Sequence, residues 1–322
     1  MKFAAPGWAA IAALAAVPAM QAQAQGYPSK PIRIIVAYPA GQGTDIATRY
    51  LADQIARDLG QPIIIDNRPG AGGNVGTEAT AKAHPDGYTL TMGTNATHVL
   101  NEFLYSKIPF NAGSDFAPVV MVGTFPMVLA VSSTSNLKSA RQLVDTVKAA
   151  PRGADIALPS TSARLVVELL KERSAVPLFG VPYKGASTAI TDLIGGQLEA
   201  IVDTPTSLRP HLQSGKLRAL AVTSKQASPL VPGVAPIAEQ GYPDFDVIAW
   251  NALYAPKGTP APVIQTLNAA FNKALQRPET RQKLLELGFE PAGGTPESLQ
   301  AFGRSERQKW QGVIATAGLK AD

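Results

Sequence analysis

The sequence contains no cysteine, and this absence removes several kinds of chemistry. The chain can supply no disulfide bond, no zinc–thiolate site and no thiolate nucleophile. Histidine is scarce too, and the three copies, His84, His98 and His211, show no close spacing that would bind a metal ion. A G-x-S-x-G motif for a nucleophilic serine is also missing. The residues therefore give no support for an enzyme.

Long apolar runs are confined to the N-terminus. A lone positive charge at Lys2 precedes the Ala-rich stretch 3–20, and Ala22 and Ala24 follow at the positions that a signal peptidase reads. A membrane anchor is the competing interpretation, but prolines interrupt this stretch and it is too short to span a bilayer well. We therefore predict a signal peptide over residues 1–24, cleaved after Ala24, and an exported protein.

The charge of the chain is weakly positive and dispersed. The formal net charge is +5 at pH 7, and Lys and Arg form no dense cluster. This distribution argues against a nucleic-acid partner and is compatible with a small anionic ligand.

Short β-branched runs alternate with helical periodicity, which is the pattern of an α/β fold. We expect strands at 32–36, 63–65, 89–92, 119–122, 128–131, 151–159, 198–202, 217–222 and 247–253. We expect helices at 44–59, 77–83, 139–149, 163–172 and 189–194, and two amphipathic helices around 263–275 and 299–314. The isoleucine run 63–65 predicts a buried parallel strand, and the Pro- and Gly-rich segment 226–245 predicts a long surface connection.

The order of these elements suggests two α/β lobes joined by crossover strands, with a ligand cleft between them. We predict a first lobe formed by residues 25–128 and 250–322 and a second lobe formed by residues 129–249.

Two polar loops directly follow predicted strands, at the edge where open α/β sheets bind ligands. The segment 39–45 (PAGQGTD) combines glycines, which let a ligand approach the backbone, with a helix start whose free N–H groups suit a carboxylate or a phosphate. The segment 93–98 (GTNATH) gathers hydroxyl, amide and imidazole groups. Both segments also fit ordinary loops between a strand and a helix.

The glycine-rich segment 67–76 (NRPGAGGNVG) does not fit a nucleotide site, because its glycines are spaced too widely for G-x-G-x-x-G. We predict a turn there that leads into a helix. The segment 159–164 (PSTSAR) carries hydroxyls that suit a helix N-cap. Arg164 on its first turn could hold a carboxylate by two parallel hydrogen bonds, or lie solvated on the surface.

Taken in order along the chain, several stretches resemble the Bug-type extracytoplasmic solute receptors of tripartite tricarboxylate transporters. The resemblance runs from Tyr27 to about Lys320. It rests on 27–33 (YPSKPIR), 43–45 (GTD), 67–74 (NRPGAGGN), 85–90 (PDGYTL), 181–185 (VPYKG), 215–223 (GKLRALAVT) and 255–260 (APKGTP).

The resemblance implies a type II periplasmic-binding-protein fold, with two α/β lobes that close around a small carboxylate. It implies a periplasmic monomer with no cofactor, no metal and no reaction, which delivers its ligand to the membrane components of a tripartite tricarboxylate transporter. A sensor that reports the carboxylate to a signalling partner is the alternative. The ligand-facing residues that the resemblance implies are Tyr38, Ala40, Gly41, Gln42, Gly43, Asp45, Thr94, Asn95, Thr97, His98, Ser160, Thr161, Ser162, Arg164, Tyr183, Lys184, Gly185 and Asp203.

Two departures from the family pattern bear on the ligand. Gln42 interrupts a loop that is usually an unbroken glycine run, and the loop before residue 163 is shorter, lacks glycines and has Arg164 where a histidine falls. Our hypothesis is that Arg164, or Arg209 in the second lobe, engages a second carboxylate. The ligand would then be a dicarboxylate, either an aromatic one such as terephthalate or a short aliphatic diacid.

Overall fold

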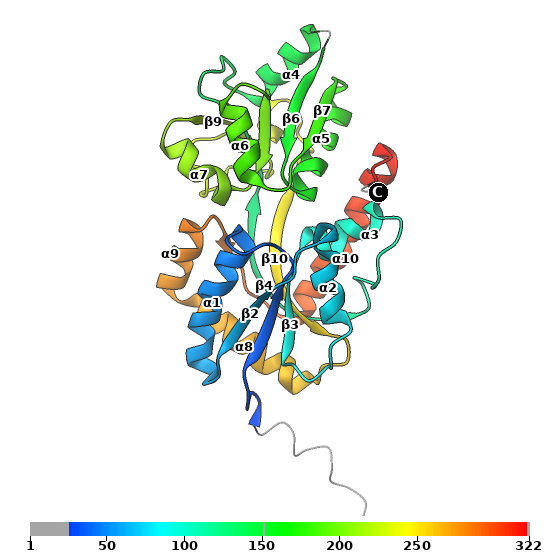
Figure 1. Ribbon diagram of the computed structural model, residues 1–322, viewed down its shortest axis with the longest axis vertical. Coiled ribbons are helices and arrows are strands. Elements are labelled where there is room, and N and C mark those ends of the chain that lie inside the picture. The colour runs from blue at the N-terminus through cyan, green and yellow to red at the C-terminus, as the bar shows by residue number, and fades with distance from the viewer. Residues whose placement is uncertain (1–25, 151, 321–322) are drawn as a thin grey trace, which may run out of the picture.

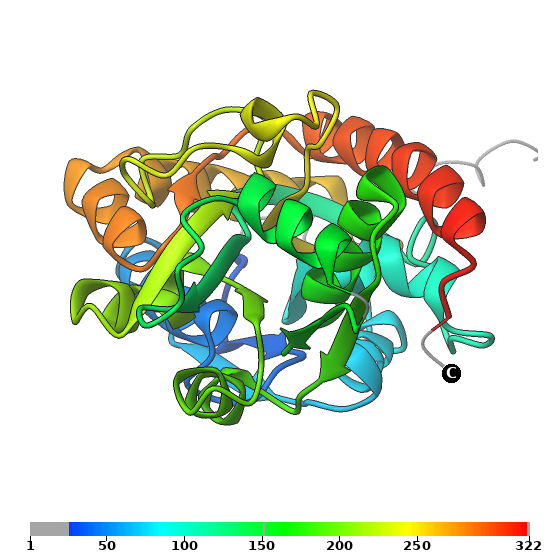
Figure 2. The same ribbon diagram turned by 90° about the horizontal axis from the view of Figure 1, so that it is seen from above.

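The computed structural model describes residues 26–150 and 152–320, which form two α/β lobes around two separate sheets (Figures 1 and 2). This architecture confirms the predicted fold class. The predicted signal peptide lies outside the described residues. Among the residues that are described, no helix combines the length and the apolar character that crossing a bilayer requires.

Within the described residues, lobe 1 is built on a six-stranded sheet. Its strands are β1 (Ile32–Val36), β2 (Ile63–Asn67), β3 (Thr89–Thr94), β4 (Phe116–Pro126), β10 (Ile248–Pro256) and β11 (Glu290–Pro291). Its helical elements are α1 (Gly43–Leu59), η2 (Ala71–Gly73), α2 (Asn74–Ala81), η3 (Ala96–Leu100), α3 (Asn101–Leu104), α8 (Ala261–Gln276), α9 (Pro278–Glu286) and α10 (Pro296–Ala317).

The strands of lobe 1 run in the order β11-β4-β10-β3-β1-β2. Strand β1 pairs in parallel with β2 and β3, whereas β10 runs antiparallel to β3 and β4. In Figure 1, α1 and α8 cover one side of this sheet and α2, α3 and α10 the other. Helix α1 buries an apolar stripe of Ala47, Leu51 and Ile55 and ends at Gly60, whose φ of 66° only glycine adopts readily.

Lobe 2 has a five-stranded sheet in its described part, in the order β7-β6-β8-β5-β9. Its strands are β5 (Val128–Ser132), β6 (Ala154–Leu158), β7 (Leu178–Pro182), β8 (Ala200–Asp203) and β9 (Leu217–Val222). Its helical elements are α4 (Ala140–Ala149), α5 (Thr161–Ser174), α6 (Ala186–Ile194), α7 (Pro205–Gln213) and η4 (Ile237–Gln240).

The chain passes between the lobes along two neighbouring strands, which Figure 1 shows crossing the waist of the molecule. Strand β4 ends at Pro126 in lobe 1, and β5 begins at Val128 in lobe 2. Strand β10 brings the chain back, starting at Ile248, which lies opposite Pro126. The predicted lobe boundaries, 128/129 and 249/250, fall beside these changes of sheet, and we assign the lobes on this basis.

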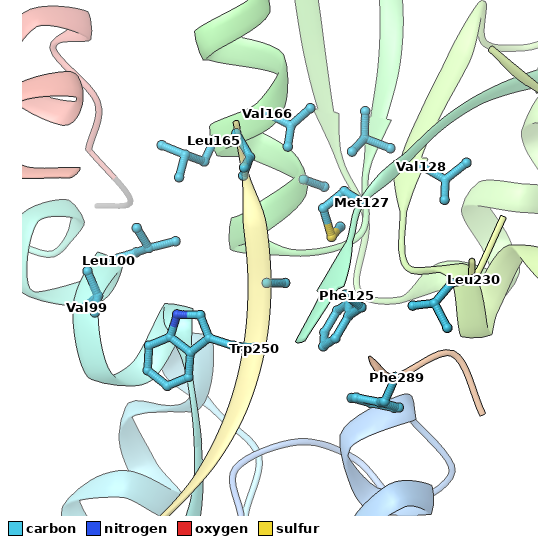
Figure 3. Close-up of a cluster of buried hydrophobic side chains, with 14 of the residues drawn as sticks. Val99, Leu100, Phe125, Met127, Val128, Leu165, Val166, Leu230, Trp250 and Phe289 are labelled. Carbon is cyan, nitrogen blue, oxygen red and sulfur yellow. The ribbon is translucent and has the colours of Figure 1, made fainter. Parts of the chain in front are cut away.

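A continuous apolar cluster fills the junction between the sheets (Figure 3). Trp250 of β10 is fully buried there, and Phe125 packs edge-on against Phe289 with ring centroids 4.9 Å apart. Met127 of the crossover lies beside them. The junction is therefore packed like a hydrophobic core, and this packing joins the two lobes.

Strand β2 corrects one expectation. Its isoleucine run was predicted to be buried on both faces, but β2 is the edge strand of the lobe 1 sheet. Ile64 is consequently 54% exposed. The prediction of a parallel strand is right, and the prediction of full burial is wrong, because a continuous apolar run does not tell an edge position from a central one.

Candidate ligand-binding cleft

A cavity of about 950 Å³ lies between the two lobes. Lobe 1 contributes the loop between β1 and α1, the end of β3 and part of β10. Lobe 2 contributes the turns that precede α5, α6 and α7. Phe125, Met127 and Phe289 of the apolar junction form part of the wall (Figure 3). The cavity thus combines an apolar wall with polar loops from both lobes.

Hydrogen bonds to the buried side chain of Asp45 hold the loop between β1 and α1 in place. This carboxylate is 2% exposed and accepts hydrogen bonds from the Gly41 N–H (2.8 Å) and from the side chains of Arg49 (3.0 Å) and Asn67 (2.9 Å). Asn67 also donates to the Tyr38 carbonyl at 3.0 Å. Burial by itself raises the pKa of Asp45, but these hydrogen bonds outweigh it and hold the pKa below its usual range.

The network gives Asp45 a structural position rather than a place on the cavity surface. It shapes a loop in which Gly41, with a φ of 84°, has open space where a side chain would be. Helix α1 begins at Gly43 without a side-chain cap, so its first N–H groups are not satisfied by a capping side chain. Such a helix start is a favourable place for an anion.

The end of β3 supplies the second polar loop. The Tyr38 hydroxyl and Thr94 Oγ1 lie 2.8 Å apart, which joins this loop to the first. Asn95 reaches across the cleft, where its Nδ2 donates to Ser162 Oγ of lobe 2 at 3.1 Å. Both side chains are buried. This pair is therefore a direct polar contact between the lobes at the edge of the cavity.

Thr97 and His98 lie behind that loop and do not line the cavity. Thr97 Oγ1 is 2.9 Å from His98 Nδ1 and accepts from the Thr94 N–H. The imidazole stacks on Tyr254, with centroids 4.1 Å apart, and burial lowers the pKa of His98 to about 3, assisted by the positive charge of Arg307. His98 is thus a neutral packing residue that supports the turn.

Asp203 of β8 brings an acid to the cavity wall. It is 4% exposed, and its Oδ1 accepts from the Thr204 N–H at 2.7 Å. Burial raises the pKa of Asp203 to about 7, although the Thr204 N–H and the nearby Ser207 hydroxyl act to lower it. Thr204 caps α7 by accepting from the Ser207 N–H.

In the part of the chain that the structure describes, the cavity wall carries two exposed lysines, Lys184 and Lys216, both of lobe 2. Tyr183 lies behind Lys184, where its hydroxyl donates to Asp192 at 2.7 Å and ties the loop to α6. Arg164 does not line the cavity. Arg209 faces away from it and donates to the main-chain oxygens of Leu285 and Glu286 in lobe 1.

Of the eighteen residues expected to face the ligand, the structure brings most to the cavity. Those on its wall are Tyr38, Ala40, Gly41, Gln42, Gly43, Thr94, Asn95, Ser160, Ser162, Lys184, Gly185 and Asp203. Those placed behind or away from it are Asp45, Thr97, His98, Thr161, Arg164 and Tyr183.

Several wall residues were missed from the sequence, and Asn251 is the clearest. It is 1% exposed, its Oδ1 accepts from Thr44 Oγ1 at 3.4 Å, and its Nδ2 has no partner. Its signal was an amide within the otherwise apolar strand 248–253. His211 and Lys216 also line the cavity, and neither was expected there from the sequence.

The described residues of the wall therefore offer hydroxyl, amide and ammonium donors and a single acid. Among the residues that the structure describes, no three His, Asp or Glu side chains gather closely enough to hold a metal ion. This donor set suits a small ligand that accepts hydrogen bonds and bears negative charge.

A fold of two lobes with such a cleft between them is that of a solute-binding receptor. The sequence matches the tripartite tricarboxylate transporter family receptor over residues 47–319, and the chain belongs to this family. The predicted family membership is confirmed, and with it the expectation that the protein is a binding protein and not an enzyme.

Relatives of known name agree with this assignment. The chain is 38% identical to protein BugT of Bordetella pertussis over 300 residues, which cover 92% of each chain. The solved R. palustris protein Rpa4515, with adipate, has a TM-score of 0.86 and 31% identity, covering 91% of this chain and 99% of that one. MatC from Rhodopseudomonas palustris, with bound malate, has a TM-score of 0.80 and 31% identity, covering 89% and 100%.

Proposed function

We propose that this chain is exported to the periplasm, captures a dicarboxylate between its lobes as a monomer, and delivers it to the membrane components of a tripartite tricarboxylate transporter. The observation that supports the ligand class most directly is the presence of Lys184 and Lys216 on a cavity wall that is otherwise rich in uncharged donors. Export is supported by the predicted signal peptide at residues 1–24, and delivery by the family to which the chain belongs.

One carboxylate of the ligand would lie against lobe 1. The uncapped start of α1 and the unpartnered Nδ2 of Asn251 offer N–H donors there. A buried donor without an acceptor is costly, so an anion that accepts from Asn251 would recover a lost hydrogen bond.

The other carboxylate would meet the cations of lobe 2. Lys184 and Lys216 both line the cavity, and their ammonium groups are free to move toward an anion because both side chains are exposed. We assign the second carboxylate to these lysines rather than to Arg164 or Arg209, because neither arginine lines the cavity.

Part of the cavity wall is apolar. Phe125, Met127 and Phe289 belong to it, and Ile46 of lobe 1 and Ile194 of lobe 2 add exposed apolar side chains. A hydrocarbon chain or ring between two carboxylates fits this wall better than a polyhydroxylated body, whose hydroxyls would lose their hydrogen bonds to water. The diacids in two solved relatives, adipate and malate, agree with this class.

A thermal-shift screen of the chain from residue 25 onward tests the proposal. The panel contains mono-, di- and tricarboxylates, both aliphatic and aromatic, together with neutral sugars. A bound ligand raises the melting temperature because it stabilises only the folded state, by about 2.7 kcal/mol at a hundredfold excess over its dissociation constant. We expect shifts confined to dicarboxylates. If only sugars raise the melting temperature, or if no carboxylate raises it, the proposed ligand class is excluded.

A further inference from the structure

Asp203 is the one acidic side chain on the described wall of the cavity. It is the last residue of β8, next to the turn that starts α7, and lies opposite Val128 of β5. Its Oδ1 is occupied by the Thr204 N–H, but its Oδ2 is buried and has no hydrogen-bond partner. A receptor for an anion thus holds an acid in its own binding wall.

No cation from the described part of the chain neutralises this acid. Lys184, Lys216 and His211 line the same cavity, but none of them forms an ion pair or a hydrogen bond with Asp203 among the described residues. Of the elements packed on β8, strand β5 carries no charged residue.

The charged side chains on the remaining neighbours of β8 are engaged or directed elsewhere. On α5, Glu168 pairs with Lys171, and Glu172 and Arg173 are exposed. Arg164 of α5 does not line the cavity, and on α6, Asp192 accepts from Tyr183. On β6, Asp155 is exposed. No charged side chain therefore contributes to the pKa of Asp203, which burial raises and which the Thr204 N–H and the nearby Ser207 hydroxyl lower.

The unpartnered oxygen decides which protonation state fits this environment. An ionised carboxylate would leave a buried negative charge on Oδ2 without a donor, which a protein interior tolerates poorly. A protonated carboxyl group instead makes that oxygen a hydrogen-bond donor. Burial raises the pKa of Asp203 from 3.8 to about 7, so about half of the groups carry the proton at pH 7 and most carry it at lower pH.

We propose that Asp203 meets the ligand as a neutral carboxylic acid, whose Oδ2–H donates a hydrogen bond to a ligand carboxylate, so that capture is linked to proton uptake. This inference rests on the proposed function and narrows its ligand class to dicarboxylates without an ammonium group near Asp203. The proton stays on Asp203 throughout, and the protein takes it from solvent before or during binding. An ionised acid at the same place would instead repel the carboxylate.

Calorimetry of the purified protein with adipate and with terephthalate tests this link. Only the protonated fraction of Asp203 is competent to bind, so the apparent affinity should fall about tenfold between about pH 6 and about pH 8. Near pH 8, the measured heat should also depend on the ionisation enthalpy of the buffer, because binding takes up a proton. Asp203→Asn keeps a donor that does not titrate, and its affinity should become independent of pH.

His211 needs a matched control, because histidine is the other residue type that changes charge between about pH 5 and about pH 8. His211→Gln should keep the tenfold dependence, whereas loss of that dependence would assign the titration to His211 and overturn the role of Asp203. An affinity that rises with pH, or that is flat in the unsubstituted protein, would overturn the inference alone.

Absence of binding to any diacid would overturn the proposed function, and this inference with it. A carboxyl ¹³C titration of the ligand-free protein gives a test that needs neither a variant nor a ligand. A midpoint near 7 supports the neutral acid. A highest carboxyl midpoint in the ordinary range of Asp, near 4, overturns it.

Discussion

The carboxyl group of Asp203 ties the stability of the fold to pH. Its pKa is 3.8 in an unfolded chain and about 7 in the folded protein, because burial disfavours the charged form. The folded state therefore retains a proton that the unfolded state has released. The resulting stabilisation is complete below about pH 4 and is lost as the pH rises through about 7.

Replacing this group by an amide should remove the pH-dependent term. Relative to the unsubstituted protein, Asp203→Asn should gain stability between about pH 4 and about pH 8, by up to about 4 kcal/mol for a pKa shift of this size. Thermal denaturation of both proteins across this range measures the difference. His98 is present in both proteins, so its contribution to the pH dependence of stability cancels in the difference. Parallel pH profiles would show that Asp203 titrates normally.

Lys184 and Lys216 should contribute to affinity separately and modestly. Both side chains are exposed, and exposed charge pairs are worth about 0.2–1 kcal/mol, so Lys184→Gln and Lys216→Gln should each weaken diacid binding about two- to fivefold. The effect should shrink as salt is added. Lys148→Gln, on an exposed position of α4 outside the cavity, is the control. If calorimetry finds the same affinity for all three variants, Lys184 and Lys216 do not contact the ligand.

Residues of the site were predictable where a loop directly follows a strand. Gly41 and Thr94 were found because the ends of neighbouring parallel strands meet at one edge of a sheet. Asn251 and Lys216 were missed because they reach the cavity only through the return of β10 and the placement of α7. The residues next to them in the sequence therefore do not indicate that they line the cavity.

Among the elements, α10 is tied to the crossover region by one buried acid. Glu306 Oε2 accepts from the indole N–H groups of Trp250 on β10 (3.4 Å) and Trp310 on α10 (3.1 Å). Both indoles are fully buried. Because a buried donor that loses its acceptor is expensive, this acid fixes how α10 lies on the lobe 1 sheet.

Glu306→Ala should destabilise the protein by about 2–3 kcal/mol, since it leaves two buried indole N–H groups without an acceptor. Glu306→Gln retains a carbonyl acceptor in the same place and should cost clearly less. Urea denaturation of the two variants measures the free energy of unfolding. Equal losses would mean that the charge of Glu306, and not its hydrogen bonds, is what matters.

The elements that were predicted best are those with a long, regular pattern. Helix α1 and strand β1 start and end within a residue of the expected bounds because apolar periodicity and a terminal glycine agree there. Helix α7 was missed because Pro205 and Pro210 look like helix breakers; Pro205 occupies the first turn, where it is tolerated. Strand β7 was missed because Gly180 and Pro182 are residue types that disfavour a strand, although an edge strand tolerates them.

For the whole molecule, the contacts that bridge the lobes set how readily they move apart. Arg209 of α7 donates to the main-chain oxygens of Leu285 and Glu286 at the end of α9. Thr206 donates to the Leu287 carbonyl beside it. Carbonyls at a helix C-terminus are good acceptors for a guanidinium, because the negative end of the helix dipole lies there.

Arg209→Ala should therefore loosen the lobes and weaken ligand binding, by about three- to tenfold if the lost hydrogen bonds are worth about 1 kcal/mol. Arg218 gives a matched control, since its guanidinium donates to carbonyls of Ser133, Ser135 and Leu137 within lobe 2. Arg218→Ala should lower stability without changing small-angle scattering of the ligand-free protein. Scattering that changes equally in both variants would exclude a specific role for Arg209 between the lobes.

The central claim is that the cleft recognises two carboxylates on one ligand. The most direct measurement is calorimetry with pairs of equal length that differ in one carboxyl group, adipate against hexanoate and terephthalate against 4-methylbenzoate. Lys184 and Lys216 can engage only the second carboxylate, so we predict that one or both diacids bind and that the matching monoacid binds at least tenfold more weakly. Equal affinity for diacid and monoacid would contradict dicarboxylate capture.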